Sequence, residues 1–177
     1  MNKVRIATTW LDGCSGCHMS FLDIDQRLVD IADQIEIVYS PLVDALAIPD
    51  DIDVAFIEGA VSSEDDARKV RLLRERSKLL IALGDCAVTG NVSAMRNAFG
   101  VEEVLERVYC AGATGENGVP TEDVPRLEPH ASPVHSYVKV DAFLPGCPPP
   151  SDAILYMVTE LLAGHVPDML GKSRFGA

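Results

Sequence analysis

Two cysteines separated by two residues mark the stretch of this sequence that is richest in chemistry. Cys14 and Cys17 lie in WLDGCSGCHMS, and His18 follows them directly. This spacing is compatible with a c-type haem attachment site, a dithiol redox pair, half of a zinc site or half of an iron–sulfur site. The rest of the chain has to discriminate among these four kinds of site.

Two further cysteines, Cys86 and Cys147, lie far along the chain in GDCAVTG and PGCPPP. A thioredoxin-like dithiol would leave both without a role. Zinc fingers generally combine two close pairs, and here one pair is joined by two distant single cysteines. Glycine lets the backbone approach a bulky group, and proline holds the exit from such a site rigid. Four thiols in these surroundings favour a 4Fe–4S cluster.

Three other residues are candidates for a part in the chemistry. Glu58 ends the apolar run DVAFIEG, where a carboxylate is either solvated at a loop or a partly buried proton carrier. His18 is expected to cap a helix or pack instead of binding metal. Cys110 in VYCAG is expected to pack as a small apolar residue at a helix end, although its thiol could replace one of the four ligands.

The pattern of apolar residues predicts an α/β fold in one domain over residues 1–177. Continuous apolar runs are typical of strands covered on both faces, and helical patterns alternate with them. Residues 110–137, rich in Gly, Pro, Glu and Ser, are expected to form an irregular insertion before the last strand. The expected strands are 4–10, 35–41, 53–60, 78–86 and 138–146, and the expected helices are 19–33, 64–76, two within 91–109 broken near Gly100, and 151–164.

This alternation places the cysteines at one edge of a parallel sheet. Cys14 and Cys17 follow the first expected strand, Cys86 closes the fourth, and Cys147 follows the fifth. In open parallel sheets, ligand sites gather outside the carboxyl ends of the strands. Glu58, at the end of the third strand, belongs to the same edge. We therefore expect these residues to converge in space.

Composition and charge limit the partners of the chain. It has 177 residues and a formal net charge of −12. We therefore expect neither nucleic acid nor an anionic membrane surface as a partner. No apolar run approaches the roughly 18 residues that span a bilayer, and no export signal is visible. We expect a cytoplasmic protein. In such a protein the five cysteines are expected to be metal ligands, catalytic groups or buried thiols without a role, and not disulfides. The same expectation weakens the haem interpretation, because the usual attachment of c-type haem follows export.

Four motifs, in this order, resemble the small subunit of nickel–iron hydrogenases. They are LDGCSGCHMSFLDID, IEGAV, LGDCAVTGN and LPGCPPPSD, and they span residues 11–152. The likeness is strongest to the short small subunit of the soluble, NAD-reducing (bidirectional) type. Respiratory quinone-reductase relatives have two adjacent cysteines in the first motif, and GCSGC does not.

The resemblance implies a flavodoxin-like doubly wound fold and an electron-transfer role. It implies one 4Fe–4S cluster held by Cys14, Cys17, Cys86 and Cys147, and it associates Glu58 with proton movement at the subunit boundary. The implied partners are a large subunit that carries the nickel–iron centre and the iron–sulfur and flavin subunits of an NAD-reducing module. FMN could bind at the same sheet edge, but no residue requires it. Two alternatives stay open, namely an iron–sulfur subunit of another multi-subunit reductase and a flavodoxin-like flavin-binding module.

Overall fold

A central sheet of five parallel strands organises the chain, of which a computed structural model describes residues 3–115 and 118–176. The strand order β2-β1-β3-β5-β7 is the order 2-1-3-4-5 of flavodoxin-like folds. The predicted fold class is therefore confirmed. The strands are β1 (Val4–Trp10), β2 (Ile35–Tyr39), β3 (Ile52–Glu58), β5 (Ser77–Leu83) and β7 (Ala142–Leu144).

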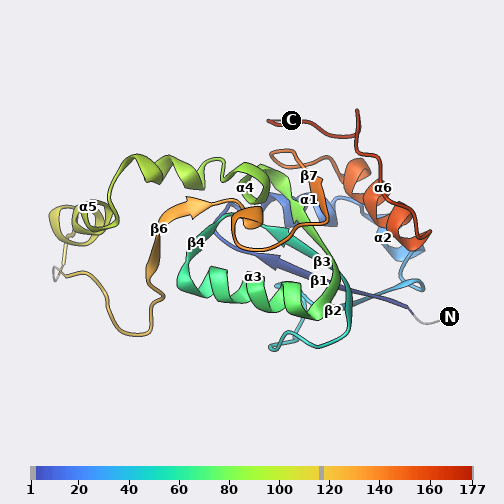
Figure 1. Ribbon diagram of the computed structural model, residues 1–177, viewed down its shortest axis with the longest axis horizontal. Coiled ribbons are helices and arrows are strands. Elements are labelled where there is room, and N and C mark those ends of the chain that lie inside the picture. Colours follow the sequence, from blue (N-terminus) through green and yellow to red (C-terminus); the bar gives the residue numbers. More distant parts are fainter. Residues whose placement is uncertain (1–2, 116–117, 177) are drawn as a thin grey trace.

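Helices cover both faces of this sheet (Figure 1). The two faces carry separate apolar clusters, as alternating side chains of buried parallel strands require. On one face, Ile6, Phe56 and Ile81 pack with Phe21, Ile154 and Met157 of α1 (Gly16–Leu22) and α6 (Ser151–Leu162). On the other, Ala55, Ile57 and Leu80 pack with Val70 and Leu73 of α3 (Glu64–Arg76) and with Ala87 of α4 (Gly84–Thr89) and Val134 of η3 (Val134–Ser136).

The helix α3 covers the same residues, 64–76, as the expected helix, and it begins in the acidic stretch SSEDDARK. The Ser63 hydroxyl accepts a hydrogen bond from the Asp66 backbone N–H, and the Asp66 carboxylate accepts one from the Ser63 N–H. This reciprocal capping stabilises the N-terminal end of α3. The acidic residues of the first turn add to this, because the helix dipole is positive at that end.

Several predicted boundaries differ from the structure, and three of the differences are large enough to have an identifiable cause or to shorten an element. The single helix expected over 19–33 is two short helices, α1 and α2 (Gln26–Asp30), because Asp25 adopts a positive φ of 60° between them. The strand expected over 78–86 ends at Leu83, because Gly84 at φ 81° turns the chain into α4. The last strand contains only 142–144 of the expected 138–146.

The segment after α4 leaves the sheet and forms an arm. It contains the 3-10 helix η1 (Ser93–Ala98), α5 (Val101–Glu106) and the π-helical turn η2 (Arg107–Ala111). Gly100 caps α5, so the predicted break near Gly100 is present. Figure 1 shows α5 at the end of the molecule opposite α2 and α6.

The expected irregular insertion, 110–137, contains one strand that the sequence pattern missed. Here β6 (Leu127–Ser132) pairs in antiparallel fashion with β4 (Val61–Ser63). Asn97 of η1 both donates to the carbonyl and accepts from the N–H of Ala131, each at 2.8 Å. Residues 112–115 and 118–126 contain no helix or strand, and β6 joins the end of this segment to the main body through its pairing with β4. No helix among the described residues is long and apolar enough to cross a membrane.

Candidate functional site

The four cysteines of the predicted ligand set lie in three segments that follow β1, β5 and β7 at the carboxyl end of the sheet. These segments, which include the first turns of the helices that follow, are called the first, second and third cysteine loops. Cys14 lies between β1 and α1, and Cys17 lies in the first turn of α1. Cys86 lies in α4 directly after β5, beyond the end of the strand that was expected to contain it, and Cys147 follows β7. Cys17 is buried, Cys86 is half-buried, and Cys14 and Cys147 are exposed.

Close contacts join these three loops to one another. The first loop meets the third, because the Ser20 hydroxyl donates to the Pro149 carbonyl at 2.5 Å. The second meets the third through Asp85, whose N–H donates to the Gly146 carbonyl at 2.9 Å and whose carboxylate accepts from the Gly146 N–H at 2.6 Å. The structure therefore brings residues from distant parts of the sequence to one place, as the sheet edge predicted.

Two glycines leave the space that the sulfur atoms occupy. A Cβ on Gly84 would lie 2.2 Å from the Cys17 Sγ atom, and a Cβ on Gly16 would lie 3.2 Å from the Cys14 Sγ atom. Gly84 also has a φ of 81°, which side chains other than glycine rarely adopt. These positions explain why glycines accompany the thiols in DGCSGC and LGDC.

The thiols influence one another electrostatically. Burial raises the pKa of the Cys17 thiol, and Glu58 and then the other three cysteines raise it further. Burial also raises the pKa of Cys86, with additional effects from Cys147 and Cys14. The Cys17 and Cys86 thiols therefore resist ionisation, and a bound cationic iron centre would remove that penalty.

The donor set fits an iron–sulfur cluster. Four thiolates are the ligands such clusters use, and each binds a different iron atom, so the sulfurs of the protein stay apart from one another. Among residues 3–115 and 118–176, no three His, Cys, Asp or Glu side chains are grouped to hold a single metal ion.

Glu58 is buried beneath the first cysteine loop. Its carboxylate accepts hydrogen bonds from the backbone N–H groups of Cys17, at 3.1 Å, and His18, at 3.0 Å. It also contacts the His18 ring at Nδ1. A strand-end carboxylate therefore fixes the backbone that carries Cys17, and of the two expected environments Glu58 occupies the buried one.

His18 packs in the interior, as expected. Its ring packs edge-on against the Trp10 ring, with the two ring centroids 5.3 Å apart. Its Nε2 atom lies 2.9 Å from the Thr8 hydroxyl oxygen. Thr8 donates in turn to the Ser40 hydroxyl at 2.8 Å. Glu58, His18, Thr8 and Ser40 thus form a buried hydrogen-bonded chain that sequence reasoning did not identify.

The remaining cysteine lies away from this edge. Cys110 is half-buried in the η2 turn of the arm, at a helix end as expected. A hydrogen bond with Glu106 raises the pKa of its thiol, and burial adds to this.

Asp85 and Asn91 are two site residues that the sequence analysis missed. Asp85 is buried and binds Gly146, 61 residues away, and the Asn91 amide lies 3.5 Å from the Cys147 Sγ atom. The only local signal was their position beside Cys86 and the glycines of LGDCAVTGN, because their partners are distant in sequence.

A family profile covers most of the chain and includes all four cysteines. The family described as "NADH ubiquinone oxidoreductase, 20 Kd subunit" matches residues 14–161. The chain belongs to this family. Members similar to it are hydrogenase subunits, so the resemblance to hydrogenase small subunits is confirmed.

Two relatives of this chain are subunits of different types of hydrogenase. The delta subunit of the NAD-reducing hydrogenase HoxS from Cupriavidus necator is 40% identical over 172 residues, which cover 94% of this chain and 82% of the relative. A subunit of the F420-non-reducing hydrogenase vhu from Methanocaldococcus jannaschii is 38% identical over 171 residues, 96% of this chain. The chain spans 59% of the length of that second relative.

A solved structure of a hydrogenase matches this chain along nearly its whole length. A chain from the crystal structure of an NAD+-reducing NiFe hydrogenase in the H2-reduced state superposes with a TM-score of 0.94 at 39% identity. The match covers 98% of this chain and 99% of the other.

Proposed function

We propose that this chain is the electron-transfer subunit of a nickel–iron hydrogenase of the NAD-reducing type. Hydrogen would be cleaved or formed in a large partner subunit, and this chain would relay electrons to an NAD-reducing module. The observation that carries the proposal is the placement of Cys14, Cys17, Cys86 and Cys147 on three interlocked loops at one sheet edge. Similarity along nearly the whole length to a subunit of an NAD-reducing hydrogenase supports it.

The four cysteines would hold one 4Fe–4S cluster. When bound, such a cluster accepts and donates single electrons. Gly84 and Gly16 leave the sulfur atoms room, and the Asp85–Gly146 hydrogen bonds keep the second and third loops in register. A rigid ligand set of this kind suits electron transfer, because its geometry changes little between oxidation states.

The sheet edge is the surface we assign to the large nickel–iron subunit. Cys14 and Cys147 are exposed there, and the nearby apolar side chains of Val92 and Met95 are exposed by 64% and 72%. A cluster left open at this edge would react with oxygen and water. Burial of the edge against the large subunit would protect the cluster and shorten the path of the electron.

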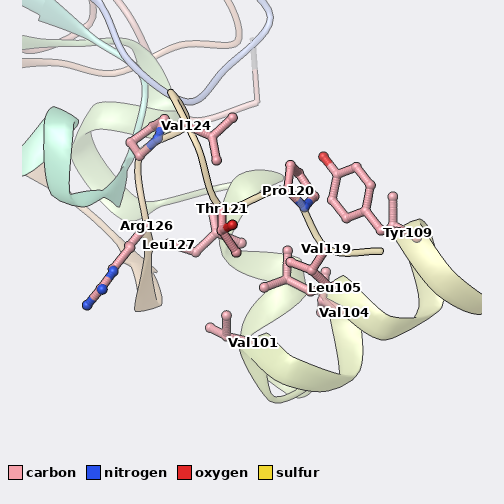
Figure 2. Close-up of a pocket in the computed structure, with 12 residues that line it drawn as sticks. Val101, Val104, Leu105, Tyr109, Val119, Pro120, Thr121, Val124, Arg126 and Leu127 are labelled. Carbon is pink, nitrogen blue, oxygen red and sulfur yellow. The ribbon is translucent and has the colours of Figure 1, made fainter. Parts of the chain in front are cut away.

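The arm provides a second surface, which we assign to the NAD-reducing module. A groove of about 560 Å³ lies between α5 and the segment 119–127, and Figure 2 shows the side chains that line it. Val101, Val104, Leu105, Tyr109 and Val119 line it, so the groove is largely apolar. An apolar groove at the far end of the molecule suits a protein contact that leaves the cysteine edge free.

Glu58 would carry protons near the boundary with the large subunit. The buried chain Glu58–His18–Thr8–Ser40 supports this role, since each member lies within hydrogen-bond reach of the next. An assembly that reduces NAD needs the NAD of the cell, so we expect a cytoplasmic location.

A second candidate is an iron–sulfur subunit of a different multi-subunit reductase. The family description itself, a 20 Kd subunit of NADH ubiquinone oxidoreductase, favours this alternative. Both candidates use the same cysteines and differ in the partner. Nickel in the co-purifying large subunit would favour the hydrogenase.

Metal analysis of the native assembly and of cysteine variants tests the proposal. Beyond the iron and sulfide that the partner subunits hold, we expect about four iron and four sulfide per copy of this chain, as one cubane contains. Cys14→Ser, Cys17→Ser, Cys86→Ser and Cys147→Ser should each lose or degrade the cluster, because an alkoxide is a poor substitute for a thiolate. Cys110→Ser is the matched control and should keep it. Zinc or no metal in the wild-type chain, or iron loss confined to Cys110→Ser, would refute the assignment.

A further inference from the structure

Asn91 follows the helix that carries Cys86 and places its side-chain amide beside the sulfur atom of Cys147, on a different cysteine loop. Its Nδ2 atom lies 3.5 Å from the Cys147 Sγ atom, within the range of a hydrogen bond to sulfur.

The local backbone holds Asn91 in this position. Gly90, at φ 87°, ends α4, and Asn91 follows with a φ of 37°. Asparagine tolerates such a positive φ better than most residues. The Asn91 backbone N–H donates to the Thr89 hydroxyl at 3.3 Å, which itself donates to the Asp85 carbonyl at 2.8 Å. The turn at the end of α4, the helix that carries Cys86, therefore holds the Asn91 side chain in this position.

A donor at a thiolate sulfur has a definite electrostatic effect. Reduction adds negative charge to a cluster and its ligands, and a hydrogen bond to the sulfur stabilises the more negative state. Hydrogen bonds to sulfur are among the factors that set the potentials of iron–sulfur centres.

We propose that Asn91 is a positioning residue that raises the reduction potential of the cluster by donating a hydrogen bond to Cys147. The inference rests on the proposed function, since it needs the four cysteines to bind the cluster.

The test is a redox titration of the purified hydrogenase assembly, followed by EPR. Asn91→Gly removes the amide and keeps the positive φ without strain. We expect the ratio of reduced to oxidised cluster at a fixed potential to fall about tenfold, a shift of about 59 mV for one electron toward more negative values. Asn91→Asp keeps the shape of the side chain but replaces the donor with a negative charge, so it should shift the potential further in the same direction.

Ser93→Ala is the control for a disturbed loop. Its hydroxyl donates to the Asp12 carbonyl at 3.0 Å, so its removal perturbs the loop without removing a donor to sulfur, and the potential should stay unchanged. A full iron content in both Asn91 variants with an unchanged potential would overturn the inference and leave the proposed function intact. Loss of iron from both variants would also overturn it, because Asn91 would then hold the loop together instead of tuning the cluster. Absence of the cluster from the wild-type chain is the separate result that would refute the proposed function.

Discussion

Gly84 and Gly16 both face a cysteine sulfur. A Cβ atom added to Gly84 would come closer to that sulfur than one added to Gly16. Gly84 joins β5 to the helix that carries Cys86, and it leaves room for the sulfur of Cys17 from a different loop. One residue thus fixes both the turn of the second cysteine loop and its distance from the first.

Replacement of Gly84 by alanine should therefore damage the fold and the cluster together. The new Cβ would lie 2.2 Å from the Cys17 Sγ atom, and the φ of 81° would be strained. We expect the free energy of unfolding to fall by about 1–3 kcal/mol and iron to be lost. Gly100→Ala is the control, because no atom lies within 4 Å of its added Cβ. Chemical denaturation and iron analysis measure both effects; full iron content in Gly84→Ala would contradict this expectation.

One substitution can separate the structural part of Glu58 from the proton-carrying part that we propose for it. Glu58→Gln keeps an acceptor oxygen but turns an amide toward N–H donors, so we expect a loss of about 1–3 kcal/mol in stability. If Glu58 carries protons, hydrogen oxidation by the assembly should fall roughly tenfold or more with the iron content unchanged. Glu75→Gln, on the exposed face of α3, should change neither quantity. An unchanged rate would leave Glu58 with the structural part alone.

At this scale the sequence located the four cysteines that we assign as ligands, but not the residues that support them. Cysteine is rare and its flanking glycines are visible, so Cys14, Cys17, Cys86 and Cys147 could be named from spacing and expected strand ends. Asp85 and Asn91 act through partners about 60 residues away, and no local pattern records such contacts.

Among the elements, the edge strand β7 is held in the sheet by polar contacts of Asp141 with Leu80 and Arg74, called the Asp141 lock below. The Leu80 N–H donates to the Asp141 carboxylate at 2.9 Å, and the Asp141 N–H donates to the Leu80 carbonyl at 2.9 Å. Arg74 of α3 pairs with the same carboxylate. Burial would raise the pKa of Asp141, but hydrogen bonds from Arg74 and Leu80 outweigh it and lower the pKa. The lock joins α3, β5 and β7, and thereby supports the strand that leads to Cys147.

This lock should weaken in acid. A carboxyl whose pKa is lowered in the folded state stabilises the fold above its unfolded pKa of about 3.9, and that stability is lost as the pH falls through the folded value. Asp141→Asn should lower the free energy of unfolding by about 1–2 kcal/mol at neutral pH, and the difference from wild type should shrink below about pH 4. Denaturation across this pH range measures it, with the exposed Asp44→Asn as control. A difference that is constant with pH would argue against the lock.

Element order could be predicted more fully than element ends. Apolar runs covered on both faces identified all five strands of the main sheet and their parallel arrangement. The end of β5 was missed because Gly84 turns the chain inside an apolar run. The strand β6 was missed because it pairs with the short β4, and LEPHAS lacks the apolar pattern of a buried strand.

The whole molecule presents two candidate functional surfaces at different places, the cysteine edge and the arm. We expect the arm to meet a partner whose contact is apolar at the centre and basic at the rim, since α5 also carries Glu102, Glu103 and Glu106 and the chain has a net charge of −12. Permanent interfaces of multi-subunit enzymes bury more than about 2,000 Å², and two surfaces let one chain take part in two of them.

A charge placed in the groove should separate these two contacts. Val104→Glu should weaken binding of the NAD-reducing module at least roughly tenfold, while the large subunit and the iron stay bound, because a buried unpaired carboxylate is costly. Val29→Glu, on the exposed surface of α2 at the other end of the molecule, should have no such effect. Native mass spectrometry of the purified assembly distinguishes the outcomes. A wild-type chain that is a stable monomer or homodimer would contradict both assigned surfaces.

The distribution of the cysteines over three loops also sets the order in which the molecule can be made. Cys14 and Cys147 come from opposite ends of the chain, and only the completed sheet brings their loops together. Contacts so distant in sequence form late in folding. The two apolar layers that stabilise the sheet are built almost entirely from residues other than these cysteines. Biogenesis should therefore run in one direction: the chain folds first, iron is delivered to a preformed site, and the partner subunits then close over it.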